Sequence, residues 1–507
     1  MRFPARRSWL PVLAVLMGSC ALPAATQAPR GDRLPVREII LANGMRFLVL
    51  QLRGAPTVAF VAQYSVGGVN EHLGTTGIAH LLEHLLFKGT TSVGTRDHER
   101  ELVWFRLMDA VHDSLLAARS QPGADPAGIL VLEERLRALQ DSARAVVVPN
   151  ELDRILTRNG ARSLNAITTN ESTLYYMEMP ANRAKLWFVL EADRMVNPVF
   201  REFYTERDVV LEERLTRVDT NPGGLLYEAH LATAYQVHPY GVPVVGWASD
   251  VRSHTRQDVA DYYRRYYGPN NAVVAIVGDV SPREIERWAR RYFGDFPRGA
   301  EPPPVLVEEP EQRGERRVEV RFDAEPAVRI GWHTVDVFHP DHPALVMLSA
   351  LLTGGRTSRL YDALVLDRRI ATYVGSTLGP GERFPRLFMV EGYPRAPHTT
   401  ANLEEAVYAE LASLAETGPE EIELERVRNQ LEAGAVRRLQ TNFGLALQLA
   451  GSASLFGDWR TTFRLEERLS TVTAADISRV VRTYLRPENR TVATLVKAPA
   501  ATTPEER

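Results

Sequence analysis

The chain has the composition of a globular protein with several domains. Its 507 residues are 45% apolar and 24% charged, which supplies sizeable hydrophobic cores for roughly two to four domains. The formal net charge is only −3, so bulk electrostatics give no reason to expect nucleic-acid binding or attraction to an anionic membrane.

Residues 1–28 have the pattern of an export signal. Arg2, Arg6 and Arg7 precede an apolar run that is too short to span a membrane, and small residues follow. The only cysteine, Cys20, sits in a sequence that resembles a bacterial lipobox. One interpretation is a periplasmic lipoprotein anchored to the outer membrane at Cys20. The other is a secreted chain whose signal is cut further on, after Ala28.

The segment TGIAHLLEHLLFKGT predicts a helix over residues 76–88, with a threonine to cap its start and a glycine at its end. His80 and His84 lie one turn apart on this helix, Glu83 lies beside them, and the other faces carry Leu and Ile. Burying these polar groups without partners would cost several kcal/mol each. A divalent cation removes that cost, because two neutral imidazoles at this spacing can bind one metal.

H-x-x-E-H is the inverted form of the zinc-protease motif. Zinc held by two histidines and a third ligand keeps one position open and lowers the pKa of a water there, and Glu83 can take that proton. The alternatives are a buried histidine pair satisfied by its neighbours and a purely structural zinc.

Residues 99–150 contain two amphipathic helical stretches, RELVWFRLMDAVHDSLLAARS and ILVLEERLRALQDSARAVV, separated by the turn-rich QPGADPAG. We interpret them as a helical hairpin inserted into one domain. The alternative is that they are an ordinary part of that domain.

The third metal ligand is expected in YTERDVVLEERLTRVDTNP. Glu206 and Glu213 are seven residues apart, so they share one face of a helix. One carboxylate would bind the metal and the other would orient a ligand. Glu212 points elsewhere on the helix and is the alternative ligand. The other interpretation of this segment is a solvated acidic face.

Two pairs of segments repeat along the chain. The segment from Thr255 reappears 218 residues later from Thr473, and each copy predicts a capped helix, a Pro-Asn turn and an apolar strand. A half-buried strand near Pro56 reappears 270 residues later near Pro326. The two offsets differ by 52 residues, which matches the length of the hairpin segment.

The repeat predicts two related domains. FPRGAEPPPVLVEEPEQRGERR is rich in Pro, Gly and charge, which is typical of a linker, here placed at 296–316. We expect a zinc-bearing domain at 32–295 and a homologous domain without a metal motif at 317–500. The strands form hairpin-like pairs without a regular βαβ alternation, so the α+β class is expected.

GIAHLLEHLLFKGT, LNAITTNESTLYY and ERDVVLEE with a later DTNP closely resemble motifs of the pitrilysin family, which includes insulin-degrading enzyme and the mitochondrial processing peptidases. The resemblance covers almost all of the mature chain. It implies a zinc metalloendopeptidase whose two homologous α/β-roll domains form a bowl-like half of a peptidase chamber.

By motif matching, the resemblance implies that His80, His84 and Glu213 bind Zn²⁺, that Glu83 is the general base and that Glu206 is the acid that orients a ligand. The 129 residues between His84 and Glu213 exceed the family's usual spacing. The excess agrees with the insertion deduced from the repeat offsets.

The resemblance also implies two substrate-binding residues. Asn165 falls in a strand whose edge would bind an extended peptide as an added strand; the alternative is a turn residue at a strand end. In the second domain, active members carry an Arg and a Tyr seven residues apart. Tyr373 matches the Tyr, but Leu366 stands where the Arg is expected.

Because the family includes heterodimers in which the partner supplies the Arg/Tyr pair, Leu366 favours a zinc-bearing subunit of a homo- or hetero-oligomer. The alternative is a single-chain or homodimeric enzyme that tolerates the loss. The leading function is hydrolysis of peptides or unfolded protein segments. The alternatives are a non-catalytic scaffold or chaperone-like chamber, which the intact metal motif disfavours, and a processing peptidase with one defined substrate.

Overall fold

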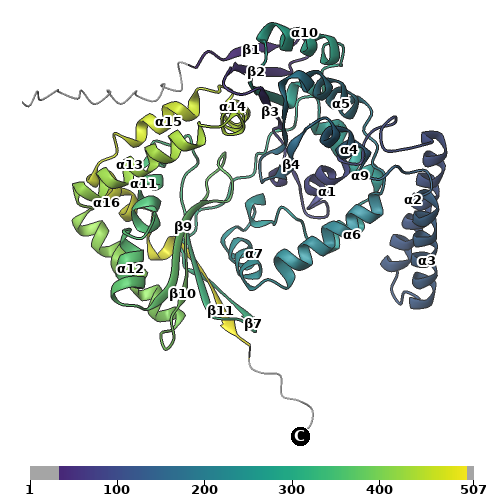
Figure 1. Cartoon of the computed structure of the whole chain (residues 1–507). Helices are drawn as coiled ribbons and strands as arrows, with labels where there is room; N and C mark the ends of the chain where they lie inside the picture. Colours follow the sequence, from purple (N-terminus) through teal and green to yellow (C-terminus); the bar gives the residue numbers. More distant parts are fainter. Residues whose placement is uncertain (1–33, 499–507) are drawn as a thin grey trace, which may run out of the picture.

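The structure is a computed structural model that describes residues 34–498, arranged as two mixed sheets with helices packed on them (Figure 1). The first sheet has the strand order β1-β2-β6-β3-β5-β4. Its strands are β1 Arg37–Ile40, β2 Arg46–Gln51, β3 Thr57–Tyr64, β4 Arg162–Thr168, β5 Thr173–Pro180 and β6 Ala272–Gly278. β2 and β6 are parallel, and the other neighbours are antiparallel.

The second sheet repeats this topology without an equivalent of β1. Its order is β7-β11-β8-β10-β9, with β11 parallel to β7 and antiparallel to β8. Its strands are β7 Arg316–Phe322, β8 Ala327–His333, β9 Ala371–Gly379, β10 Leu387–Pro394 and β11 Arg490–Lys497. The expected α+β class with two related halves is therefore confirmed.

Sixteen α-helices lie within the described residues. Those of the first half are α1 Ile78–Leu85, α2 His98–Ser120, α3 Pro126–Ala143, α4 Glu151–Arg158, α5 Ala184–Val196, α6 Phe203–Arg214, α7 Pro222–Ala234, α8 Ala248–Ser253, α9 Arg256–Tyr266 and α10 Pro282–Phe293. Those of the second half are α11 His342–Thr353, α12 Thr400–Thr417, α13 Glu421–Arg438, α14 Asn442–Phe456, α15 Thr461–Leu469 and α16 Ala474–Tyr484.

The repeated segments form the same local structure in both halves. Thr255 and Asp258 close a capping box at the start of α9, and Thr473 and Asp476 close the equivalent box at the start of α16. A Pro-Asn turn and then a sheet strand, β6 or β11, follow each helix. The predicted order of helix, turn and strand is thus present in both copies.

The two halves exchange helices. α14 comes from the second half but packs on β3 and β6, where Leu445 and Leu449 meet Ala59 and Val61. Conversely, α7 comes from the first half and packs on β7 and β11 of the second sheet. The sheets are therefore joined by covalent chain and by two reciprocal apolar contacts (Figure 1).

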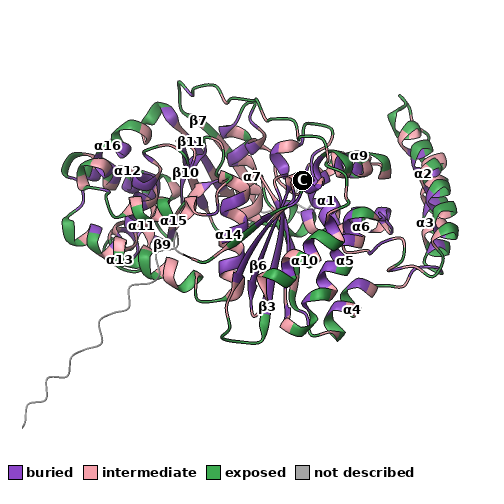
Figure 2. Cartoon of the chain, turned by 90° about the horizontal axis from the view of Figure 1, so that it is seen from above, coloured by how far each residue is buried: buried purple, intermediate pink, exposed green. Residues whose placement is uncertain are grey.

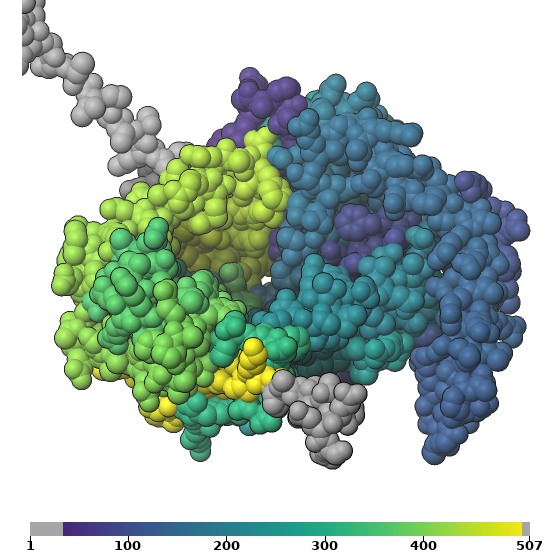
Figure 3. Space-filling view, turned by 60° about the horizontal axis from the view of Figure 1, so that its bottom comes forward, coloured from purple at the N-terminus to yellow at the C-terminus, as the bar shows by residue number. Residues whose placement is uncertain are grey.

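Burial follows this architecture. The strands β3 and β6 are buried along almost their whole length (Figure 2). α2 and α3 form a hairpin at the edge of the first half. Phe105, Met108 and Leu136 pack into the core cluster of that half, and the outer surface of the hairpin is exposed (Figure 2). The space-filling view shows a hollow between the two halves (Figure 3).

Residues 297–315, between the halves, contain neither helix nor strand. Across residues 34–498, no helix combines the length and the apolar character needed to cross a membrane. The proposed export signal and Cys20 lie outside the described residues.

Candidate metal centre

Glu71 caps the N-terminus of α1. Its two carboxylate oxygens accept hydrogen bonds from the backbone N–H groups of Gly77 and Ala79, both at 2.8 Å. Thr76, which the sequence indicated as the cap, instead donates its hydroxyl to Asp250. The helix is also shorter at both ends than expected. The expectation of a threonine cap is wrong because a carboxylate from outside the helix satisfies the free N–H groups of its first turn.

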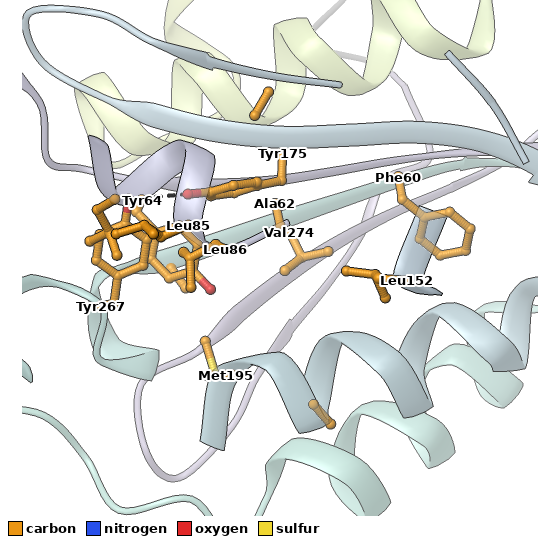
Figure 4. Packing of buried hydrophobic residues seen from close by; sticks show 14 of the residues in the cluster. Phe60, Ala62, Tyr64, Leu85, Leu86, Leu152, Tyr175, Met195, Tyr267 and Val274 are labelled. Carbon is orange, nitrogen blue, oxygen red and sulfur yellow. Dashed lines mark hydrogen bonds between the residues drawn. The ribbon is translucent and has the colours of Figure 1, made fainter. Parts of the chain in front are cut away.

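The apolar face of α1 packs into the core of the first half (Figure 4). Leu85 and Leu86 lie in one cluster with Tyr64, Tyr175 and Tyr267. The rings of Tyr64 and Tyr267 have centroids 4.4 Å apart. This packing holds the helix, and with it the polar side chains that it carries.

Side chains from α1 and α6 converge on one point. His80 Nε2 and His84 Nε2 lie 3.5 Å and 3.4 Å from Glu213 Oε2. The three ligand atoms lie within 4.8 Å of one another, and no other group of three or more His, Cys, Asp or Glu side chains in residues 34–498 meets this criterion. The chain thus closes a gap of 129 residues between His84 and Glu213. Glu212, the alternative ligand, is exposed.

These three side chains fit a zinc ion. Ligands about 2.0–2.1 Å from a tetrahedral zinc lie roughly 3.3 Å from one another. The two imidazole–carboxylate separations, 3.5 Å and 3.4 Å, are close to this edge length. Two histidines and one glutamate are also a donor set of catalytic zinc sites, which keep their fourth position open.

Glu206 holds the other side of the His84 ring. Its Oε2 lies 3.4 Å from His84 Nδ1, and its Oε1 lies 2.6 Å from Lys88 Nζ. A carboxylate in this position fixes the tautomer and the orientation of a metal-binding imidazole. Nδ1 of His80 has no such partner among the described residues.

The two imidazoles differ in charge when no metal is bound. Burial, together with the nearby His84, lowers the pKa of His80 to about 4. Burial alone would lower the pKa of His84, but hydrogen bonds with Glu206 and Glu213 raise it to about 9. These opposite shifts favour a neutral His80 and a protonated His84. A metal held by both rings would take the place of the His84 proton among the carboxylates.

Glu83 lies next to the two histidines in sequence but outside the converging set. It is buried, and its Oε2 accepts a hydrogen bond of 2.5 Å from the hydroxyl of Thr168 on β4. Burial raises the pKa of Glu83, and the bond from Thr168 opposes that rise. A carboxyl group whose pKa moves towards neutrality can both accept and return a proton.

The strand that carries Thr168 is an edge strand. β4 ends the first sheet, and Asn165 lies on it with an exposed side chain. The side-chain oxygen of Asn165 accepts a hydrogen bond from the N–H of Ala166. An edge strand presents backbone groups with which an extended peptide can pair. The predicted peptide-binding strand therefore runs past Glu83.

Tyr373 lies on the edge strand of the other sheet, β9, and it is not part of the converging set. It lines a cavity of about 520 Å³ with Arg329, Glu391 and Asn170. Asn170 comes from the first half and the others come from the second, so the cavity lies between the halves. Burial and the charge of Glu391 raise the pKa of Tyr373.

Leu366, at the position of the family's Arg, is 40% exposed in the π-helical turn Tyr361–Asp367. The nearby Arg368 pairs with Glu410 at 2.7 Å. The arginine that shares a cavity with Tyr373 is Arg329, from β8. Sequence reasoning missed it, because no motif spacing links these two strands and only the sheet order brings them together.

Sequence reasoning also missed Glu71, Lys88 and Thr168. Lys88 and Thr168 lie within the motif segments quoted above, and that position is the one signal that could have singled them out. Motif spacing says which residues occur together. It does not say which polar side chain contacts which.

Two family models match this chain. The one described as Insulinase (Peptidase family M16) matches residues 139–246, and the one described as Peptidase M16 inactive domain matches residues 253–431. The chain is 28% identical over 443 residues to the zinc protease PqqE of Helicobacter pylori, covering 86% of each chain. It is 27% identical to an uncharacterized zinc protease of Mycobacterium bovis over 473 residues, covering 92% of this chain and 93% of that one.

Solved structures share the whole fold. The crystal structure of a protease from Helicobacter pylori has a TM-score of 0.76 at 25% identity and covers 91% of this chain and 99% of that one. A peptidase M16 inactive domain from Pseudomonas fluorescens has a TM-score of 0.71 at 17% identity, covering 93% and 100%. From its matched segments, its relatives and its fold, the chain belongs to peptidase family M16, the insulinase family.

Proposed function

We propose that this chain is a zinc-dependent endopeptidase in which His80, His84 and Glu213 hold the metal. The observation that carries the proposal is the convergence of these three side chains from two helices at zinc-ligand spacing. Zinc held this way would polarise a peptide carbonyl and lower the pKa of a water near it.

Glu83 is the proton carrier of the proposed reaction. It lies beside the ligands without joining them, and burial raises its pKa. It would take a proton from the attacking water and deliver it to the leaving amine. Thr168 holds the carboxylate in place, and Glu206 keeps the His84 ring aligned.

Peptides and unfolded protein segments are the proposed substrates. An extended chain added along β4 would be held mainly through its backbone, which suits broad sequence preference. Asn165 on β4 and Tyr373 in the cavity between the halves are the proposed contact residues.

Export to the periplasm, with lipidation at Cys20, is proposed from the N-terminal sequence. The domain limits 32–295 and 317–500 are proposed from the internal repeat and the linker.

Leu366 supports a further proposal, that the chain works as the zinc-bearing subunit of an oligomer with a related chain. Such a partner would supply the Arg/Tyr pair, of which this chain carries the Tyr alone at the matching positions. Size measurement of the purified chain, alone and with a related chain that lacks the histidine motif, tests this directly.

The deciding experiment compares the wild-type chain with Glu83→Gln on a library of quenched fluorogenic peptides. We expect Glu83→Gln to keep one zinc per chain and to lower kcat/KM by about 10³-fold, because proton transfer is lost while the ligands remain. Glu212→Gln, an exposed position on α6, is the matched control and should keep wild-type activity. Wild-type activity in Glu83→Gln would overturn the proposal, and so would a zinc-loaded wild type that cleaves nothing either alone or with a related chain that carries the Arg/Tyr pair.

A further inference from the structure

The guanidinium of Arg201 holds the segment that follows α1 by hydrogen bonds to its backbone, an arrangement called the clamp below. Arg201 is 1% exposed and precedes α6 by two residues. Its guanidinium donates to the backbone carbonyls of Lys88, Thr90 and Val93. The remaining donors pair with the two carboxylate oxygens of Glu101 at 2.7 Å and 3.0 Å. All five N–H groups of the guanidinium are thus used.

Residues 88–94, the loop that follows α1, surround this guanidinium. Gly89 and Gly94 have φ values of +92° and +94°, which residues other than glycine rarely adopt. A Cβ atom at Gly94 would lie 2.6 Å from Arg201 Nη1, and one at Gly89 would lie 3.1 Å from it. The glycines therefore permit the close approach of Arg201 to the loop.

Glu101, the carboxylate in this clamp, belongs to the hairpin. It lies near the start of α2, is fully buried, and forms an ion pair with Arg201 that no solvent reaches. Removing one partner of such a pair leaves a buried charge without compensation. The hairpin that the repeat offsets identify as an insertion is therefore tied to the loop that follows the metal-binding motif.

A short series of contacts leads from the clamp to a metal ligand. Arg201 binds the carbonyl of Lys88, and the ammonium group of Lys88 pairs with Glu206 at 2.6 Å. Glu206 in turn contacts His84 Nδ1 at 3.4 Å. The position of Lys88 thus depends on the hairpin, and the position of Glu206 depends on Lys88.

The hairpin also contacts α6 directly. The Tyr204 hydroxyl donates to Asp109 at 2.7 Å, and Arg207 Nη1 lies 2.6 Å from His112 Nε2. Asp109 and His112 lie on α2, whereas Tyr204 and Arg207 lie on the helix that carries Glu213. Two independent sets of polar contacts therefore connect the hairpin with the metal centre.

We infer that the α2–α3 hairpin is a positioning element of the metal centre, in which Glu101 acts through Arg201 and Lys88 to orient Glu206 and His84. The inference rests on the proposed zinc site and adds to it a role for the inserted segment. Glu101, Arg201 and Lys88 are positioning residues, because none of them contacts the site of the metal.

The test measures the zinc Kd of the metal-free full-length chain by competition with a chromophoric chelator, for Glu101→Gln, Lys88→Met and the double variant. We expect each single change to raise the Kd by about tenfold, as for other groups that orient metal ligands. The double variant should bind zinc little more weakly than the weaker single variant, because both changes interrupt the same series of contacts. Glu133→Gln, in an exposed hairpin ion pair with Arg119, is the control and should leave the Kd unchanged.

Urea unfolding of the metal-free variants separates loss of fold from loss of positioning. If Glu101→Gln does not fold, the zinc Kd values of Lys88→Met and Tyr204→Phe test the inference instead, because both variants keep the buried Glu101–Arg201 pair. Folded variants that bind zinc as tightly as wild type, or single effects on log Kd that add fully in the double variant, overturn the inference while the proposed function survives. A wild-type chain that binds no zinc contradicts the proposed function itself.

Discussion

At the scale of single residues, the polar groups of α1 have partners on other elements. Glu83 is held by Thr168 from β4, His84 by Glu206 from α6, and the free N–H groups of the first turn by Glu71. Buried polar side chains need such partners, because each unpaired group costs free energy of folding. The motif residues are therefore placed by residues outside the motif.

Thr168→Val tests this placement. The substitution keeps the shape of the side chain but removes the hydroxyl that donates to Glu83. We expect kcat to fall by about tenfold while zinc content stays at the wild-type level, because the carboxylate loses its orientation. Thr168→Ser keeps the hydroxyl and should retain most of the activity. Equal kcat values for the Val variant and the wild type would show that the bond has no role in the reaction.

The proposed metal ligands could be picked out from the sequence. Helix periodicity places His80 and His84 one turn apart and Glu206 and Glu213 on one face, and the family resemblance singles out Glu213 from the two acids. Of the groups that hold these side chains, the resemblance indicated only Glu206, which lies at His84 Nδ1; the others could not be predicted. Thr168 and Glu71 reach α1 through the closed fold, and neither their spacing nor their residue type marks them. The cap of α1 was predicted wrongly for the same reason.

At the scale of elements, the exchanged helices α7 and α14 connect the halves. The repeat in the sequence predicted the corresponding strands and the helices α9 and α16. It did not predict that α14 packs on the sheet of the other half, since an apolar helix face shows that it is buried without showing against which sheet. Sheet order and helix exchange are set by contacts between distant segments.

Leu449→Ala tests the exchange. Leu449 is fully buried on α14 against the first sheet, so its truncation leaves a cavity between the halves. We expect a loss of about 2–5 kcal/mol in the free energy of unfolding of the metal-free chain, measured by urea unfolding. Ile422→Ala, 66% exposed on α13, should change that free energy by less than about 0.5 kcal/mol. A Leu449→Ala variant as stable as the control would mean that α14 contributes little to joining the halves.

At the scale of the whole molecule, the buried His230 and His238 and the half-buried His333 lie at the contact between α7 and the second sheet. His230 on α7 pairs with the carbonyl of Thr491, and His333 on β8 pairs with that of Ala234. His238, just after α7, accepts a hydrogen bond from the N–H of Tyr240. Burial lowers the pKa of His230 to about 3 and of His238 to about 4, and it also lowers the pKa of His333.

These histidines predict that acid weakens the joint between the halves. Below about pH 6.5 these histidines become protonated in the unfolded chain but stay neutral in the folded chain. The free energy of unfolding therefore falls as the pH drops towards 4. Between pH 7.5 and 5.0, His230 and His238 should each contribute a loss of about 2 kcal/mol, because their pKa values in the folded chain lie near 3 and 4. Urea unfolding at the two pH values, with EDTA present, measures this loss of unfolding free energy. His238→Asn keeps an acceptor for the Tyr240 N–H and should lose less stability than the wild type between the two pH values. An equal loss would show that His238 does not contribute to the pH dependence.

The central claim is that one zinc ion joins His80 and His84 on α1 to Glu213 on α6. The most direct measurement is the zinc-binding isotherm of the metal-free chain, compared between the wild type, Glu213→Ala, Glu83→Gln and Glu212→Gln. We predict one tight zinc per chain in the wild type and in the Glu83 and Glu212 variants, and a Kd higher by at least about 100-fold in Glu213→Ala. Wild-type affinity in Glu213→Ala would contradict the account.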